Sequence, residues 1–249
     1  METQQRHPDS HAASKTSDFQ DHSTNPADWS VLTGETPQTR MASWRQQRER
    51  VDVIAFYQDR QGNPWREFSN FYQRTNDSFE FVLPRQLLDI AGVSEDQRDQ
   101  YAPVIHCDFS EKAIMLCKAA VMGDANSYAA IAAATTPKDA KLLGRTVGPW
   151  NDERWQQVVC GVAVAALRQK FAVPTLRKKL QSTGHMVLAE ATRQDKVWAI
   201  GINLNMPTVY QVPARWRGSN ILGWALMQVR EVQRAEDQVH RGAGGDMHG

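Results

Sequence analysis

The chain has 249 residues, of which 41% are hydrophobic, and its 29 basic and 28 acidic residues leave a formal net charge of +1. This balance excludes a basic coat for nucleic acid over the whole surface and a polybasic membrane anchor, while a local basic groove stays open. Three cysteines without CxxC spacing are too few for a disulfide framework, so we expect a reducing compartment, either cytoplasmic or nuclear.

Polar residues dominate both ends of the chain. Residues 1–48 are rich in Gln, Ser, Thr, Asp and His, so we expect a disordered N-terminal tail. Residues 237–249 are predicted to form a second, shorter disordered tail, which leaves residues 49–236 as one folded domain. The sequence contains neither a long apolar run typical of a membrane span nor the apolar stretch of a signal peptide.

Hydrophobic periodicity predicts mostly helices with a few strands, and hence an α+β, mostly helical single domain. The strands have β-branched and aromatic residues, and the helices have apolar residues three and four positions apart. We expect strands at 51–57, 79–83, 186–191 and 197–202, and helices at 110–123, 126–135, 137–143, 151–171, 174–183 and 221–234. We read the last two strands as a hairpin.

The helix predicted at 110–123 is the most informative element. It is apolar almost all round, which is typical of a buried helix, yet it carries Glu111 and Lys118. Seven residues are nearly two helical turns, so both side chains point the same way, about 10.5 Å apart along the axis. A desolvated lysine is a candidate nucleophile, and a nearby carboxylate is a candidate acid or base.

A second interpretation of these two residues is purely structural. Lys118 could extend along the apolar surface until its ammonium group reaches solvent. Either Asp108 or Ser110 could cap the helix, and Glu111 could complete a capping box with Asp108, which lies three residues earlier. The pattern alone leaves both interpretations open.

Two further segments have residues suited to binding. In 65–71, aromatic side chains alternate with Ser69 and Asn70, so rings could stack on a base while the polar groups form hydrogen bonds; these aromatics could equally fill the core. In 216–223, a glycine-containing loop leads into a helix capped by Asn220, where an anion would be stabilised and Arg217 could bind phosphate. An ordinary helix cap is the alternative.

A third set is the acidic pair Glu190 and Asp195 with Trp198. Paired acids suit the cleavage of glycosidic bonds, although acids at strand ends are also commonplace. His106 and His185 have no partner at metal-ligand spacing. The phosphate-loop, dinucleotide and nucleophile-elbow motifs are missing from the sequence, so we expect no metal and no cofactor.

In order along the chain, several segments resemble the NADAR superfamily, also called YbiA-like. The resemblance covers about Val51 to Arg234. Its motifs are EFSNFY (67–72), Ser110-Glu111 with Lys118, LGR (143–145), Trp155, KF (170–171), LAEAT (188–192), Asp195 with VWAIG (197–201), and WRGSNILGWALMQVR (216–230).

The resemblance implies an N-glycosidase acting on ribosyl compounds, with Glu111 as the catalytic glutamate and Lys118 as the helix lysine. It also implies substrate-binding positions, to which the residue patterns add Glu190, Asp195 and Arg217. The positions carried over are Ser69, Asn70, Phe71, Gly144, Arg145, Trp198, Gly201, Gly218 and Asn220.

The chain departs from the family pattern at three places. The link from Tyr72 to Ser110 is long and lacks a Trp-Pro step, which should alter the pocket rim and the choice of substrate. Lys112 replaces the histidine or tyrosine that often follows the glutamate. Residues 199–203 (AIGIN) replace a glycine-rich stretch, which puts the local phosphate contacts in question.

We therefore expect hydrolysis of the bond between ADP-ribose and a guanine base in nucleic acid or a nucleotide, with ADP-ribose as product. Lys118 would form a Schiff base and Glu111 would shuttle protons. Arg145, Arg217 and the helix start at Asn220 would hold the diphosphate. Three alternatives remain: a glycosidase of ribosylaminopyrimidine phosphates from the riboflavin pathway, a non-catalytic module that binds ADP-ribose, and a partner-binding protein whose 1–48 tail carries the function. The sequence does not predict an oligomeric state.

Overall fold

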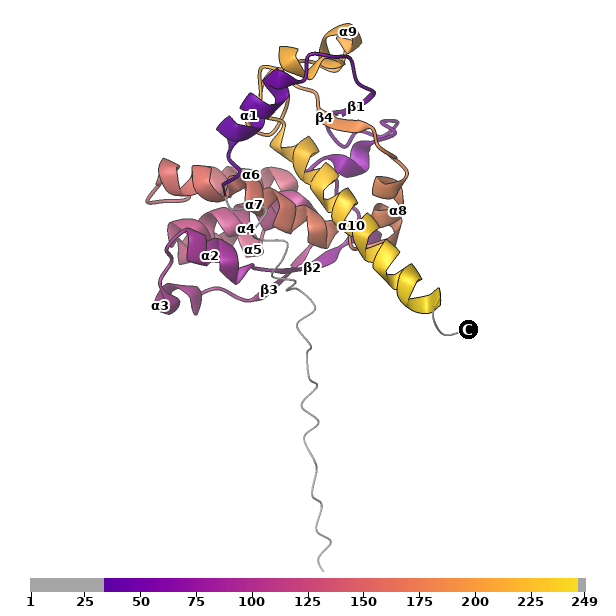
Figure 1. Cartoon of the computed structure of the whole chain (residues 1–249). Coiled ribbons are helices and arrows are strands. Elements are labelled where there is room, and N and C mark those ends of the chain that lie inside the picture. The colour runs from indigo at the N-terminus through magenta and orange to yellow at the C-terminus, as the bar shows by residue number, and fades with distance from the viewer. Residues whose placement is uncertain (1–33, 246–249) are drawn as a thin grey trace, which may run out of the picture.

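The computed structural model describes residues 34–245 as a mixed domain in which helices predominate (Figure 1). The strands are β1 (Val53–Phe56), β2 (Phe79–Val82), β3 (Val104–Cys107) and β4 (Val187–Glu190). The helices are α1 (Pro37–Gln46), α2 (Arg85–Ile90), α3 (Glu95–Arg98), α4 (Ser110–Met122), α5 (Ala125–Ala132), α6 (Pro137–Arg145), α7 (Asp152–Lys170), α8 (Pro174–Gln181), α9 (Pro207–Tyr210) and α10 (Ile221–Gly245).

Helix α7 is the central element of the core. Its N-terminus is capped by the side chain of Asn151, and small and β-branched residues along its length are buried. Helices α4 and α10 both pack against it, and α4 in turn contacts α5 and α6. The predicted burial of the helix that carries Glu111 and Lys118 is therefore confirmed, because α4 is enclosed by three other helices.

Two small sheets complete the domain. Strands β1 and β4 pair in parallel, with Phe56 opposite Glu190, and β2 pairs with β3 in antiparallel fashion. Asn220, just before α10, strengthens the first sheet, since its side-chain amide donates to Leu188 O at 2.9 Å and its Oδ1 accepts from the N–H of Glu190 at 3.2 Å. The expected α+β, mostly helical fold is thus confirmed.

The hairpin predicted for residues 186–202 is wrong. Strand β4 pairs with β1, while residues 197–202 form an irregular loop. Asp195 explains the difference, because its Oδ1 accepts hydrogen bonds from the N–H groups of Val197 and Trp198, both at 2.8 Å. These donors are consequently unavailable to a strand ladder.

The predicted tails also need correction. Residues 37–46, inside the expected 1–48 tail, form α1, which begins with a capping box between Thr36 and Thr39 and packs on the domain through Trp44. The expected 237–249 tail is shortened as well, because α10 continues to Gly245 rather than ending near Arg234. The remaining parts of both predicted tails, 1–33 and 246–249, lie outside the described residues.

Among the described residues, we find no single helix that is both long and apolar enough to cross a membrane. Helices α7 and α8 meet the length and composition criteria only as a pair, bent by 116°.

Candidate active site

A cavity of about 220 Å³ lies where α4, α6, the end of β4 and two loops meet. Side chains from five separate stretches of the chain surround it, so it exists only in the folded protein. Its lining residues are Ser69, Asn70, Phe71, Glu111, Met115, Lys118, Lys141, Gly144, Arg145, Glu190, Asp195 and Trp198.

Glu111 lies in the first turn of α4 and is only 6% exposed. The predicted capping box is wrong: Phe109 occupies the N-cap position without a side-chain bond, and the carboxylate of Glu111 lines the cavity instead. Burial raises its pKa to about 7, with Asp195 adding to the shift and the cations of Lys141, Arg145 and Lys118 opposing it. A carboxyl group with this pKa can both give and take a proton near neutral pH.

Lys118 lines the same cavity two turns further along α4, as its spacing from Glu111 predicts. Its Nζ donates to the carbonyl of Gly144 at 2.5 Å and lies 4.6 Å from the centre of the Trp150 ring. Burial lowers the pKa of Lys118, Arg145 lowers it further, and Glu111 opposes the shift. A lowered pKa increases the fraction of neutral amine, which is the nucleophilic form.

Glu190 and Asp195 add two more carboxyl groups to this cavity. Burial raises the pKa of Glu190 to about 8, and the neighbouring Asp195 and Glu111 contribute to the rise. A raised pKa increases the fraction of Glu190 that carries a proton near neutral pH. The backbone bonds to Asp195 orient the turn that brings Trp198 to the cavity wall.

Ser69 and Asn70 anchor the start of α4. The Oδ1 of Asn70 accepts a hydrogen bond from the Ser110 hydroxyl at 2.9 Å, and its carbonyl accepts from the N–H of Glu111 at 3.0 Å. The Ser69 hydroxyl oxygen accepts from the N–H of Phe71 at 3.1 Å, which shapes the loop. These residues position Glu111 as well as lining the cavity.

Two lysines that the sequence analysis did not select also belong to this region. Lys141 lies on α6 with its Nζ 4.0 Å from Glu111 Oε1 and 5.1 Å from the centre of the Phe71 ring. Its position four residues before Arg145 on one helix was the signal that could have identified it. Both residues line the cavity, so α6 supplies two basic groups to it.

Lys170 supports the site from behind. It is 1% exposed, and its Nζ donates to Ser69 O at 2.9 Å and lies 3.5 Å from the Ser110 hydroxyl. Burial lowers its pKa to about 7, although the acidic groups of Glu67, Asp77 and Asp59 oppose the shift. Its signals in the sequence were the KF motif at 170–171 and its place in the last turn of a helix with an apolar middle.

The loop at 216–220 lies behind the cavity rather than in its lining. Arg217 is exposed, and Gly218 and Asn220 are buried. The predicted side-chain cap by Asn220 is wrong, because its amide group bonds to β4. Gly218 permits close packing, since a Cβ there would lie 2.9 Å from the Cα of Lys196 and closer still to the Ala199 carbonyl oxygen.

The structure thus brings together ten of the fourteen residues named from the sequence, and leaves Gly201, Arg217, Gly218 and Asn220 outside the lining. Within residues 34–245, no group of three or more His, Cys, Asp or Glu side chains could hold a metal ion. The arrangement combines a partly desolvated amine with carboxyl groups of raised pKa, which is suited to attack on an electrophilic carbon with proton transfer.

Comparison with known proteins identifies similar chains. The model of the NADAR domain matches residues 55–234. An N-glycosidase of Acanthamoeba polyphaga mimivirus is 32% identical over 124 residues, which are 49% of this chain and 72% of that protein. Protein irg-1 of Caenorhabditis elegans is 36% identical over 125 residues, 49% of this chain and 58% of that one.

The NMR structure of the E. coli protein YbiA has a similar fold. The two structures superpose with a TM-score of 0.53 at 24% sequence identity, over 78% of this chain and 95% of that one.

Proposed function

The chain belongs to the NADAR domain family, and from this premise we propose that it is an N-glycosidase that releases ADP-ribose from an ADP-ribosylated guanine base. The observation that carries the proposal is the convergence of Glu111 and Lys118, from one helix, on a single cavity. The N-glycosidase of the mimivirus supports the general activity, since it is a relative over most of its own length.

The chemistry begins at the anomeric carbon of the ribose. The neutral amine of Lys118 attacks this carbon while the bond to the guanine nitrogen breaks, and Glu111 donates a proton to the departing nitrogen. The ribose then opens to a protonated Schiff base on Lys118, with its ring oxygen taking up a proton. Water adds to this imine with Glu111 as base, and expulsion of the amine yields free ADP-ribose.

The positions of the carboxyl groups fit the charge that develops in this reaction. The transition state has oxocarbenium character, so an ionised carboxylate beside the anomeric carbon stabilises it. Asp195 is the candidate for this role, because it lines the cavity and its neighbour Glu190 has a raised pKa. Phe71 and Trp198 form apolar walls that could flank the ribose or the adenine ring.

We assign the diphosphate to Lys141 and Arg145, one helical turn apart on α6. Both line the cavity, whereas Arg217, which we expected to share this role, does not. A volume of about 220 Å³ is below the usual range for drug-sized ligands, so ADP-ribose would be enclosed at its reacting ribose and would extend outwards along α6.

A second candidate function is hydrolysis of a ribosylaminopyrimidine phosphate from the riboflavin pathway. The small cavity favours it, because a ribose with one phosphate needs less space than ADP-ribose. A module that only binds ADP-ribose would need neither Glu111 nor Lys118 in the cavity, so the structure gives that alternative less support.

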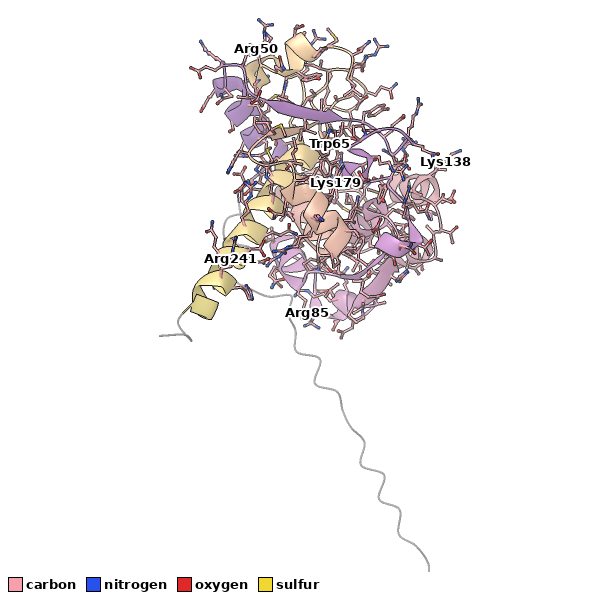
Figure 2. All side chains as sticks on the ribbon, turned by 90° about the vertical axis from the view of Figure 1, so that its right-hand side faces the viewer. Arg50, Trp65, Arg85, Lys138, Lys179 and Arg241 are labelled. Atoms are coloured by element: carbon pink, nitrogen blue, oxygen red, sulfur yellow. The ribbon has the colours of Figure 1, made fainter. Side chains whose placement is uncertain are left out.

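The test is the release of ADP-ribose from a guanine-modified oligonucleotide, assayed beside a ribosylaminopyrimidine phosphate. Glu111→Gln and Lys118→Met should each lower the rate at least about 100-fold. Lys138→Met is the matched control, since Lys138 lies on the outer side of α6 and is exposed (Figure 2). Borohydride added during turnover should trap an adduct on Lys118, and normal turnover by Lys118→Met would refute the mechanism.

A further inference from the structure

Helix α1 lies outside the part of the chain that matches the family model, yet it packs against the domain next to the start of α10 (Figure 1). About 180 residues of sequence separate the two segments in contact. The indole Nε1–H of Trp44 donates to Ser219 O at 2.9 Å, and the Ser219 hydroxyl donates to Pro37 O at 2.8 Å. The two segments are therefore joined by hydrogen bonds in both directions.

Aromatic contacts reinforce this attachment. The rings of Trp44 and Trp216 lie 4.8 Å apart, and the guanidinium of Arg40 lies 5.3 Å from the centre of the Trp224 ring. Ser219 and Trp216 are almost fully buried beneath α1. The helix thus covers Trp216 and Ser219 and holds the backbone of the loop at 216–220 through its bonds to Ser219.

The covered loop in turn holds the cavity wall. The N–H of Ser219 donates to Lys196 O at 2.9 Å, the N–H of Asn220 donates to Ala199 O at 3.2 Å, and the N–H of Leu222 donates to Trp198 O at 3.1 Å. These bonds bracket Trp198, which lines the cavity. The wall segment 195–200 therefore takes its position from the loop rather than from a strand ladder.

The same loop reaches a second cavity residue. The side chain of Asn220 accepts a hydrogen bond from the N–H of Glu190 and donates one to Leu188 O. It is therefore bonded to the end of β4, where that strand reaches the cavity. The N–H of Ile200 also donates to Glu190 O at 2.9 Å. A continuous set of hydrogen bonds therefore runs from α1 through Ser219 and Asn220 to the cavity wall.

We propose that α1 is a structural part of the active site, in which Trp44 acts through Ser219 as the positioning residue for the wall that carries Glu190, Asp195 and Trp198. Trp44 is not among the residues that line the cavity, so we assign it no part in the chemistry. The expected effect of α1 on turnover rests on the proposed function. Its expected effect on the position of the cavity wall does not depend on any substrate.

The physical reason is the weak internal support of residues 195–200. The segment has no strand partner, and a loop held by a few backbone bonds opens easily when one support is lost. Removing the Trp44 bond leaves the Ser219 carbonyl buried without that donor. The loop would then shift or fluctuate, and the wall bonded to it would follow.

The experiment compares Trp44→Phe and Ser219→Ala with the wild-type full-length chain. Trp44→Phe keeps an aromatic ring against Trp216 but removes the N–H donor, and Ser219→Ala removes the bond to Pro37. The matched control is Tyr128→Phe, which deletes one hydrogen bond, from Tyr128 Oη to Ala102 O at 2.8 Å, on the α5 side of the domain. Hydrogen exchange of residues 195–200 and steady-state kinetics on the oligonucleotide substrate are measured for each.

We expect both α1 variants to speed exchange across residues 195–200 by about three- to tenfold, and to raise KM by a similar factor with a smaller change in kcat. Tyr128→Phe should leave both quantities at the wild-type value. Unchanged exchange at 195–200 in Trp44→Phe would overturn the proposal, as would an equal increase in Tyr128→Phe. If the wild-type chain shows no turnover, the proposed function fails, while the exchange measurement still decides the role of α1.

Discussion

The buried amine of Lys170 should make the stability of the protein depend on pH in a way that one substitution removes. Its pKa falls from an ordinary value of 10.5 to about 7 because the side chain is enclosed between Ser69, Ser110 and the core. In Lys170→Met, a side chain of similar length fills the same space without a titrating group.

The sign follows from the number of protons bound in each state. Between pH 7 and pH 10.5 the unfolded chain keeps its proton on Lys170 while the folded chain has lost it, so stability rises with pH by up to about 1.4 kcal/mol per unit. Below pH 7 both states bind the proton and the gain is absent. From pH 7.0 to pH 8.5 the two pKa values give a gain of roughly 1–2 kcal/mol.

Other groups titrate in the same window, so the variant is needed as the reference. Glu190, whose pKa is raised to about 8, makes stability fall as pH rises toward 8, and the buried cysteine thiols oppose the Lys170 effect at higher pH. These contributions are common to the wild-type chain and Lys170→Met, so they cancel in the difference between the two.

The assay is urea denaturation of both proteins at pH 7.0, 7.5, 8.0 and 8.5. The free energy of unfolding of the wild type, minus that of Lys170→Met, should increase by roughly 1–2 kcal/mol across the series. Thr175→Ser, on the outside of α8, serves as a control whose difference from the wild type stays constant. If the curves for Lys170→Met and the wild type remain parallel, Lys170 is not held as a neutral amine and the reasoning is refuted.

Three further predictions concern the site and its supports. Because Lys141 lowers the pKa of Glu111, Lys141→Met should move the pH limb of kcat/KM that reports Glu111 upward from about pH 7; a limb at the same pH would contradict that electrostatic role. Gly218→Ala should destabilise the fold by at least about 1–3 kcal/mol in urea denaturation, since its Cβ would overlap the Ala199 carbonyl, and a stability equal to wild type would exclude this close approach. Thr136→Ala removes the N-cap of α6 and should cost about 1 kcal/mol of unfolding free energy, whereas Thr136→Ser should retain most of it.

The sequence predicted α4 well, because the pattern that identifies a buried helix lies within the helix itself. Apolar spacing identified the buried helix, and the seven-residue interval placed Glu111 and Lys118 on one side of it, where the structure has them facing one cavity. Thr136 and Asn151 were likewise recognisable as helix starts, since an N-cap is decided within four residues. Features that depend on only a few neighbouring residues can therefore be predicted from the sequence.

What sequence reasoning missed depends on contacts between distant segments. Lys141 and Lys170 become site residues only when α6 and α7 pack beside the loop at 69–71. The strand expected at 197–202 does not form, because the side chain of Asp195 binds the backbone N–H groups that a strand would use. Helix α1 was not predicted, because it lies in a polar stretch and is stabilised by the contact of Trp44 with the rest of the domain. Helix and strand propensities depend on neighbouring residues in the chain and do not indicate these distant contacts.

The parallel pairing of β1 with β4 has a consequence for how the protein acquires its activity. Val53 and Val187 are neighbours in the sheet but more than 130 residues apart in the chain, and the α10 segment that supports β4 comes later still. Closing so long a loop is slow, because the entropy is lost before the contacts form. A ribosome-bound chain therefore cannot assemble the candidate active site until nearly the whole domain has emerged.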